Sequence, residues 1–215
     1  KKHIDYVKHM NLNAIRLEGK FEHEEFYSYC DEVGILIMDG WNCGDAWERW
    51  AYWKEDTKII GRNSLISQLR RLAAHPCVFV FLVGSDYHPP EDIEQDWVNI
   101  FKSENWPNEY LSSATEKVSN ITGHSGVKMT GPYSWVPPHY FLFDEQEQYG
   151  GAWGFLTEGG PGENPLRKGS YDLIFPKEEI VWPLNETLWY YHCGNKVSKF
   201  STLNFFIEPL KLPSV

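Results

Sequence analysis

The stretch VFVFLVGSD at positions 78–86 decides the fold. Its first six residues are apolar and mostly β-branched or aromatic, which is typical of a parallel strand buried on both faces. Gly84, Ser85 and Asp86 follow where this strand ends. Because (β/α) barrels keep their catalytic groups at the carboxyl ends of their strands, Asp86 is a candidate catalytic acid. The alternative is an ordinary Asp that starts a turn or caps the next helix.

Strand-like and helix-like segments alternate on both sides of this stretch. Such alternation with short connections favours parallel pairing and right-handed crossovers, and hence an α/β fold. The apolar patterns predict strands at 13–18, 35–38, 78–83, 127–131, 140–143 and 153–158. They predict helices at 1–10, 22–33, 63–74, 91–102, 108–121, 164–173 and 197–206.

The tryptophan-rich segment 41–53 interrupts this alternation. It is too polar and irregular for a core element, and its length is typical of a functional loop. Aromatic residues make up 16% of the whole chain, which suits either a sugar-binding surface or an aromatic core.

Composition excludes some classes of protein. The 215 residues carry a formal net charge of -10, which argues against a nucleic-acid-binding surface and would suit a cationic substrate. No run of about 18 apolar residues occurs, so no transmembrane span is predicted. The four cysteines are widely spaced and form no metal-ligand pattern, so no metal site is expected.

The start of the chain suggests that it is a piece of a longer protein. It begins with Lys1-Lys2-His3 inside a helical pattern and without an initiator Met, so we expect a fragment or a trimmed chain. Glycosylation sequons begin at Asn120 and Asn185, and they point to the secretory pathway or an extracellular location.

Four of the predicted strands end in an acid: Glu18, Asp39, Asp86 and Glu158. Asp86 and Glu158 stand out because each follows a clear strand and lies beside glycine. Asp39 is the weakest candidate, since Asp-Gly is also a common turn dipeptide. Glycoside hydrolysis needs two carboxyl groups, one a protonated acid and the other an ionised nucleophile or base. The spacing alone leaves open whether Asp86 and Glu158 form that pair.

Several separated motifs resemble one family. They are MNLNAIRLEGK at 10–20, the segments 26–35 and 70–78, GSD at 84–86, GPYSWVPP at 131–138 and GFLTE at 154–158. Together they resemble the catalytic barrel of glycoside hydrolase family 2. Most members carry Gly-Asn-Glu where this chain has Gly-Ser-Asp, and Gly-Ser-Asp is the form found in the exo-β-D-glucosaminidase branch.

The resemblance implies roles for individual residues. Asp86 would be the general acid/base and Glu158 the nucleophile of a retaining hydrolysis. Glu18 would contact the amino group of the substrate through a charge-assisted interaction; an internal ion pair with Arg16 or Lys20 is the alternative. Walls of the same subsite would be Trp41, Asp45, Tyr133 and Trp135, for each of which ordinary packing is the alternative. His192 matches a segment near the last barrel strand, where a buried structural histidine is the simpler interpretation.

The same resemblance implies an architecture and an activity. The architecture is one partial (β/α)8 TIM barrel over residues 1–215, without its first strand and without the upstream jelly-roll and immunoglobulin-like domains. The activity is exo-acting hydrolysis of β-1,4-linked glucosamine from chitosan or chitooligosaccharide ends, with no cofactor. Carbohydrate is the expected partner, rather than nucleic acid or a membrane. The alternatives are a family 2 β-mannosidase or β-galactosidase-like hydrolase and a non-catalytic carbohydrate-binding barrel.

Overall fold

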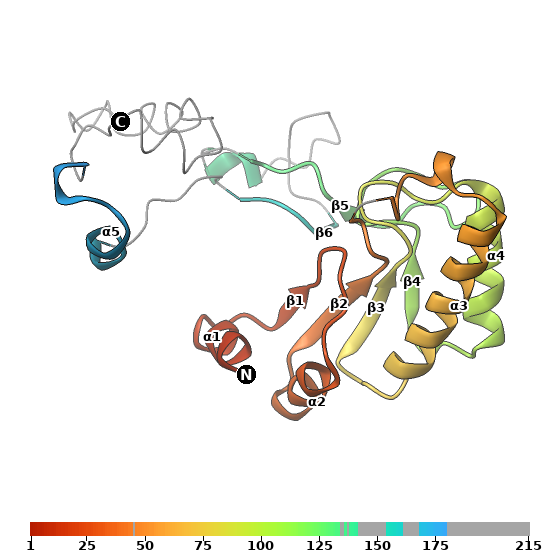
Figure 1. The fold of residues 1–215 in the computed structure, drawn as a ribbon, viewed down its shortest axis with the longest axis horizontal. Helices are drawn as coiled ribbons and strands as arrows, with labels where there is room; N and C mark the ends of the chain where they lie inside the picture. Colours follow the sequence, from red (N-terminus) through yellow and green to blue (C-terminus); the bar gives the residue numbers. More distant parts are fainter. Residues whose placement is uncertain (45, 134–135, 137, 142–153, 161–167, 180–215) are drawn as a thin grey trace. The chain divides into compact units, whose positions relative to one another are not determined.

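The computed structural model describes residues 1–44, 46–133, 136, 138–141, 154–160 and 168–179. The chain divides into two compact units. The first consists of Lys1–Met129 and Gly154–Thr157, and the second of Thr130–Trp153 and Glu158–Val215. Figure 1 labels the helices and strands of both units.

A parallel sheet forms the centre of the first unit. Its strand order is β1-β2-β3-β4, with β1 at Ala14–Arg16, β2 at Leu36–Gly40, β3 at Val78–Leu82 and β4 at Glu109–Leu111. Each neighbouring pair is parallel. Two short strands, β5 at Val127–Lys128 and β6 at Phe155–Leu156, form a second parallel pair. The predicted α/β fold with a parallel sheet is therefore confirmed.

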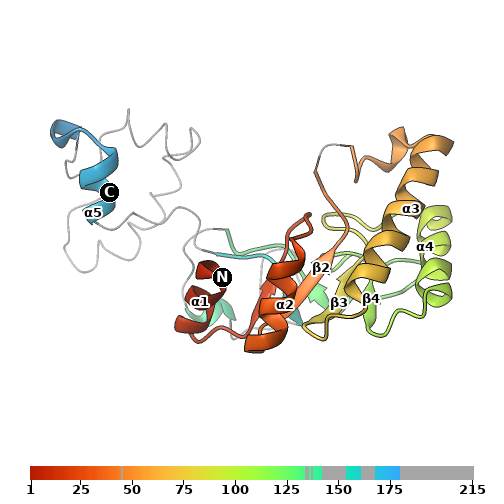
Figure 2. The same ribbon diagram turned by 60° about the horizontal axis from the view of Figure 1, so that its bottom comes forward.

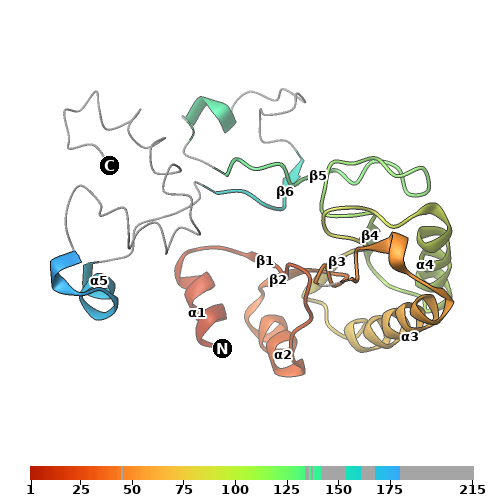
Figure 3. The same ribbon diagram turned by 45° about the horizontal axis from the view of Figure 1, so that its top comes forward.

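Helices cover one side of the four-stranded sheet. They are α1 (Lys2–His9), α2 (Glu24–Val33), α3 (Glu55–Leu72) and α4 (Glu91–Ser103). Figures 1 and 2 show α2, α3 and α4 along the same side of the strands. Strands β5 and β6 lie toward the other side, as the view in Figure 3 shows, and the Phe79 and Phe155 rings meet there with centroids 6.3 Å apart.

Strand β3 is buried on both faces, as its apolar run predicts. On the helix side, Phe81 and Val83 belong to the main core cluster, which also includes Leu65, Leu69 and Trp97. On the opposite face, the second cluster contains Met38, Val80, Leu82 and Ala114. The alternation of side chains along a strand places successive residues in these two clusters.

Helix α2 follows its sequence signals closely. Glu24 and Glu25 lie in its first turn, where carboxylates stabilise the positive end of the helix dipole. Tyr27 and Cys30 are buried against the sheet. The helix ends at Gly34, whose φ of 74° is the left-handed conformation that glycine adopts at little cost.

Five tryptophans form a continuous cluster between the segment 41–53 and α4. Centroid distances between neighbouring rings run from 4.4 to 6.2 Å across Trp41, Trp47, Trp50, Trp53 and Trp97. Trp41 and Trp53 are only 4% and 9% exposed. The expectation that this segment is too polar for the core is wrong, because its indoles pack on one another while other residues of the segment face solvent.

Helix α3 begins at Glu55, eight residues before the predicted start. Residues 55–62 lack a regular apolar stripe, so their sequence gives no helix signal. Two acidic residues in the first turn stabilise the start of the helix, and Gly61 lets the helix approach the Trp53 ring closely.

Two predicted elements are wrong. The helix expected at 108–121 is instead β4 followed by bends and turns, because Glu109–Leu111 pairs with the free edge of β3. Pairing with a preformed sheet outweighs the helical spacing of a few apolar residues. The strand expected at 140–143 is, where described, the end of the 3-10 helix η2 (Pro138–Phe141).

The described part of the second unit contains η2, helix α5 (Lys168–Ile174) and the 3-10 helix η3 (Lys177–Glu179). Helix α5 confirms the predicted helix at 164–173 over the described residues. The helix expected at 197–206 and His192 lie outside the described residues. Among the residues that the structure describes, no helix is long and apolar enough to cross a membrane.

The contact between Gly61 and Trp53 gives a test of this packing. A Cβ atom at Gly61 would lie 2.8 and 2.9 Å from two carbons of the Trp53 ring. We expect Gly61→Ala to lower the free energy of unfolding by about 1–3 kcal/mol through overpacking. This loss would appear although alanine favours a helix interior over glycine by about 1 kcal/mol.

Thermal unfolding of the variant and the wild type measures the change. Gly169→Ala in α5 is the matched control, because a Cβ atom there meets nothing within 4 Å. If Gly61→Ala leaves the melting temperature unchanged or raises it, the close packing of α3 on Trp53 is contradicted.

Candidate active site

Arg16 connects three strand ends at the carboxyl edge of the first unit. Its Nη2 donates to Ser85 Oγ at 2.9 Å, just beyond β3. Its Nη1 donates to the Thr157 carbonyl oxygen at 3.2 Å, just beyond β6. In the sequence, Ser85 directly precedes Asp86 and Thr157 directly precedes Glu158. One guanidinium on β1 thus holds the residues that come before both predicted catalytic carboxylates.

The hydroxyl of Thr157 fixes the same strand end from a second direction. It donates to the carbonyl oxygens of Ala114 at 2.6 Å and Lys128 at 3.1 Å. The Ala114 N–H in turn donates to the carbonyl oxygens of Gly84 and Ser85. The ends of β3, β4, β5 and β6 are therefore joined by hydrogen bonds around one small region.

Asp86 is exposed, and its surroundings fix its main chain and its side chain. Ser85 Oγ donates to Oδ1 of Asp86 at 3.2 Å. Lys117 donates from Nζ to the Asp86 carbonyl oxygen at 2.9 Å and lies 3.4 Å from the centre of the Tyr87 ring. Helix α4 begins after Pro90 with no side-chain cap, so Asp86 does not cap it. The capping alternative for Asp86 is therefore wrong.

Glu48 lies directly behind this turn. Its Oε1 accepts the Ser85 N–H, and its Oε2 accepts the Asp86 N–H at 3.2 Å. Burial is the largest influence on this carboxyl and raises its pKa, as does the nearby charge of Asp86; the two backbone hydrogen bonds and Arg16 act in the opposite direction. Sequence reasoning missed Glu48, because a single glutamate among tryptophans carries no recognisable signal.

Burial and three carboxylates raise the pKa of the Cys43 thiol. Burial first, and then the charges of Glu48, Glu18 and Asp86, raise the pKa of that thiol, against a hydrogen bond with Ser85 that lowers it. Glu18, which sequence reasoning named, therefore lies near Asp86 at the same strand ends. The region thus gathers three carboxyl groups, with Arg16 and Lys117 as neighbouring cations.

Glu18 is exposed, two residues beyond the end of β1. Within the described part of the chain, no ion pair joins it to Arg16 or Lys20; Lys20 pairs with Glu22 instead. The internal ion pair that sequence reasoning left open is therefore not observed, and the carboxylate is accessible to a ligand.

Asp39 is not part of this region. It lies inside β2 and is completely buried, and it accepts a hydrogen bond from the Tyr27 hydroxyl of α2 at 2.5 Å and another from the Gly40 N–H. Burial raises the pKa of Asp39 to about 6. Asp39 is thus a buried structural group that joins α2 to the sheet, and it is not one of the acids gathered at the strand ends.

The other predicted site residues are placed as follows. Trp41 is buried in the tryptophan cluster and donates from its indole N–H to the Trp47 carbonyl oxygen, so packing accounts for it. Tyr133, 48% exposed, and the half-buried Glu158 belong to the second unit. Asp45 and Trp135 lie outside the described residues.

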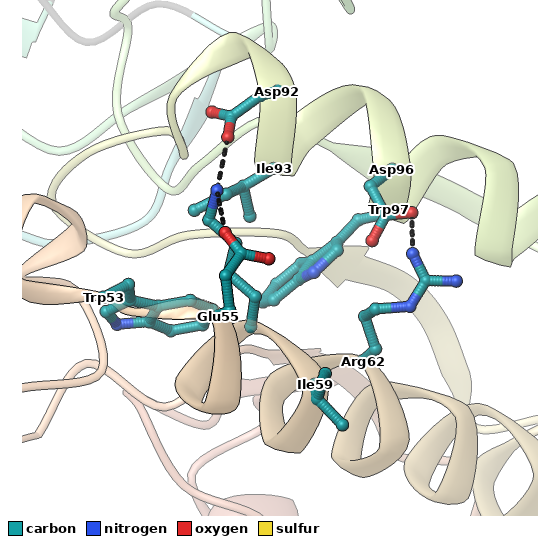
Figure 4. A pocket seen from close by; sticks show the side chains of 9 residues that line it. Trp53, Glu55, Ile59, Arg62, Asp92, Ile93, Asp96 and Trp97 are labelled. Carbon is teal, nitrogen blue, oxygen red and sulfur yellow. Dashed lines mark hydrogen bonds and ion pairs between the residues drawn. The ribbon is translucent and has the colours of Figure 1, made fainter.

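A separate cavity of about 200 Å³ opens between α3 and α4 (Figure 4). Ion pairs cross its rim between Lys58 and Asp92 and between Arg62 and Asp96. None of the predicted site residues lines this cavity, so it is distinct from the candidate active site. In the described segments, no group of three or more His, Cys, Asp and Glu side chains is suited to hold a metal ion.

No family model matches the chain, but comparison with known proteins finds exo-β-D-glucosaminidases that are similar to it. The exo-β-D-glucosaminidase of Hypocrea virens is 35% identical over 96% of the chain, and that of Amycolatopsis orientalis is 39% identical over 96%. The chain is homologous to the exo-β-D-glucosaminidases. It spans 25% and 21% of the lengths of these two relatives.

Solved structures agree with this relationship. The crystal structure of the exo-chitosanase CsxA of Amycolatopsis orientalis matches 82% of the chain with a TM-score of 0.75 and 35% identity. A complex of CsxA with PNP-β-D-glucosamine matches the same share with a TM-score of 0.76. The chain covers 21% and 22% of these structures. The resemblance that the sequence motifs suggested is therefore confirmed.

Buried Asp39 predicts a specific pH dependence of stability. Its pKa is about 6 in the folded protein and about 4 in an unfolded chain, so the folded state binds its proton more tightly. Its contribution to stability is complete below about pH 4 and is lost as the pH rises through about 6. Asp39→Asn removes this titration.

Chemical denaturation across this pH range checks the expectation. The free energy of unfolding of the wild type, minus that of Asp39→Asn, should fall between about pH 4 and pH 6. The exposed Glu109→Gln serves as control and should keep the pH dependence of the wild type. A difference between wild type and Asp39→Asn that stays constant over this range would falsify the assignment.

Proposed function

We propose that the chain is the catalytic part of a retaining exo-β-D-glucosaminidase of glycoside hydrolase family 2, which releases glucosamine from the ends of chitosan or chitooligosaccharides. The observation that carries the proposal is the Arg16 bridge, which joins Ser85 and Thr157, the residues before the two predicted catalytic acids. Homology to exo-β-D-glucosaminidases over 96% of the chain supports the same assignment.

In the proposed mechanism, Asp86 is the general acid and then the general base. It first protonates the oxygen of the leaving sugar while Glu158 attacks the anomeric carbon and forms a covalent glycosyl-enzyme. Asp86, now ionised, then takes a proton from the water that releases glucosamine. A retaining mechanism of this kind requires the two carboxyl groups to lie roughly 5–5.5 Å apart. Exposure of Asp86 at a strand end, with its main chain held on both sides, supports its role.

The proposed preference for an amino sugar rests on charge. Glu18 lies near Glu48 and Asp86, and a 2-ammonium group on the sugar would complement its exposed carboxylate. Exposed Glu18 is the proposed contact to that group, as a charge-assisted hydrogen bond. Asp45, Tyr133 and Trp135 stay predicted as walls of the same subsite. The mechanism requires no cofactor.

We further propose that the strands described here belong to a (β/α)8 barrel within a longer enzyme. Strands β1 to β4 are parallel neighbours with helices on one side, as in such barrels. The whole enzyme is proposed to act outside the cell or in the secretory pathway, where a polymeric substrate is accessible. Exposure of Asn120, the first residue of a sequon, is compatible with this location.

Substitution of Glu18 tests the proposed function. Initial rates of the full-length protein are measured on matched p-nitrophenyl β-glycosides of glucosamine, glucose and mannose. The wild type should prefer the glucosaminide. Glu18→Gln should lower kcat/KM for the glucosaminide by about 10-fold or more, corresponding to a lost charged hydrogen bond of about 1.5–3 kcal/mol, and should change the neutral sugars little.

Glu55→Gln on α3 is the control, since this glutamate is 87% exposed and outside the candidate active site. An equal loss on all three sugars would contradict the proposed amino-sugar contact. Hydrolysis of the mannoside in preference to the glucosaminide would favour the β-mannosidase alternative.

A further inference from the structure

Glu48 uses both oxygens of its carboxylate on two consecutive backbone amides. Oε1 accepts from the Ser85 N–H and Oε2 from the Asp86 N–H at 3.2 Å. These two amides belong to the turn that presents Asp86. A carboxylate can accept both bonds at once, whereas a glutamine has one acceptor oxygen and would turn its NH2 donors toward one of the N–H groups.

The turn itself has little freedom to adjust. A Cβ atom at Gly84 would collide with the Tyr87 carbonyl oxygen and come within 3.2 Å of Glu48 Oε1. The polypeptide therefore folds back tightly over Glu48 between residues 84 and 87. The direction of the Asp86 side chain depends on how this turn is held.

The tryptophan cluster fixes the main chain that leads into Glu48. The indole N–H of Trp41 donates to the carbonyl oxygen of Trp47 at 3.1 Å, and that of Trp53 donates to the carbonyl oxygen of Ala46 at 3.1 Å. These carbonyls belong to the two residues before Glu48. Because Trp41 and Trp53 are buried in the core, they tie the main chain that carries Glu48 to the rigid part of the first unit.

A carboxylate in this position is unfavourable unless other interactions stabilise it. Glu48 is partly desolvated and lies near another acid, and both effects oppose its charged form. Its two backbone bonds offset that cost only in part. What the structure gives this carboxyl group is a fixed place on the two amides of the turn that presents Asp86.

We propose that Glu48 is a positioning residue that holds Asp86 in the orientation needed to deliver its proton to the leaving oxygen. This proposal rests on the proposed function. Glu48 acts through the backbone of Ser85 and Asp86, and no contact of its own with the substrate is required. Its effect covers both proton transfers of Asp86, of which kcat/KM reports only the first, the protonation of the leaving oxygen.

Two substrates that differ in their need for that proton test the proposal. Chitobiose releases a sugar, a poor leaving group that requires the acid. 2,4-Dinitrophenyl β-glucosaminide releases a stable phenolate without protonation. The ratio of kcat/KM values on the two substrates reports acid catalysis during formation of the glycosyl-enzyme, because both values include that step.

In the full-length protein, we expect Glu48→Gln and Glu48→Ala to lower kcat/KM on chitobiose by about 100-fold, the lower end of what a general acid contributes. On the dinitrophenyl substrate the loss should be less than about 3-fold. Asp86→Ala is the reference for complete loss of the acid and should show the same selectivity, more strongly. Glu55→Gln should leave both values unchanged, because this exposed carboxylate lies outside the site.

The comparison is insensitive to poor folding, since both substrates are measured in one preparation and the ratio does not depend on the fraction of folded protein. Equal losses on the two substrates, or no loss on chitobiose, overturn the role of Glu48 while leaving the proposed function intact. A wild-type protein that hydrolyses neither glucosaminide contradicts the proposed function itself.

Discussion

The bridge made by Arg16 is the interaction on which the candidate active site depends. Its guanidinium reaches from the end of β1 to Ser85 beyond β3 and to Thr157 beyond β6. The fork of a guanidinium suits this task, because its N–H groups point in fixed directions. A lysine at the same position would supply a point charge without that geometry.

A second set of contacts connects the hydrophobic core to the same strand ends. The cluster of five tryptophans packs on α4, and two of its indole N–H groups hold the main chain just before Glu48. Glu48 then holds the amides of Ser85 and Asp86. Aromatic pairs are each worth about 0.5–1.5 kcal/mol beyond the area that they bury, so the cluster is a stable support. The segment 41–53, whose composition is typical of a surface loop, thus holds the turn that carries Asp86 in place.

The sequence predicts the parts of this structure that local patterns determine. The apolar run of β3 and the cap of α2 at Gly34 follow from side-chain spacing and glycine conformation. The helix predicted at 108–121 is wrong, because pairing of Glu109–Leu111 with β3 is a non-local interaction. The Asp-Gly dipeptide marks Asp39 as the weakest strand-end acid, but its burial could not be predicted, since it depends on which face of β2 meets α2. Arg16 and Glu48 gain their roles through partners 69 and 37 residues away, and no local pattern records such contacts.

The central claim is that Glu158 and Asp86 act as the nucleophile and acid of a retaining glycosidase. The most direct test is to treat the full-length protein with 5-fluoro-β-D-glucosaminyl fluoride, which keeps the amino group and slows hydrolysis of the glycosyl-enzyme. Peptide mass mapping should then find one fluorosugar attached to the peptide that contains Glu158. An active protein that takes up no label, or carries it on another residue, would contradict the account.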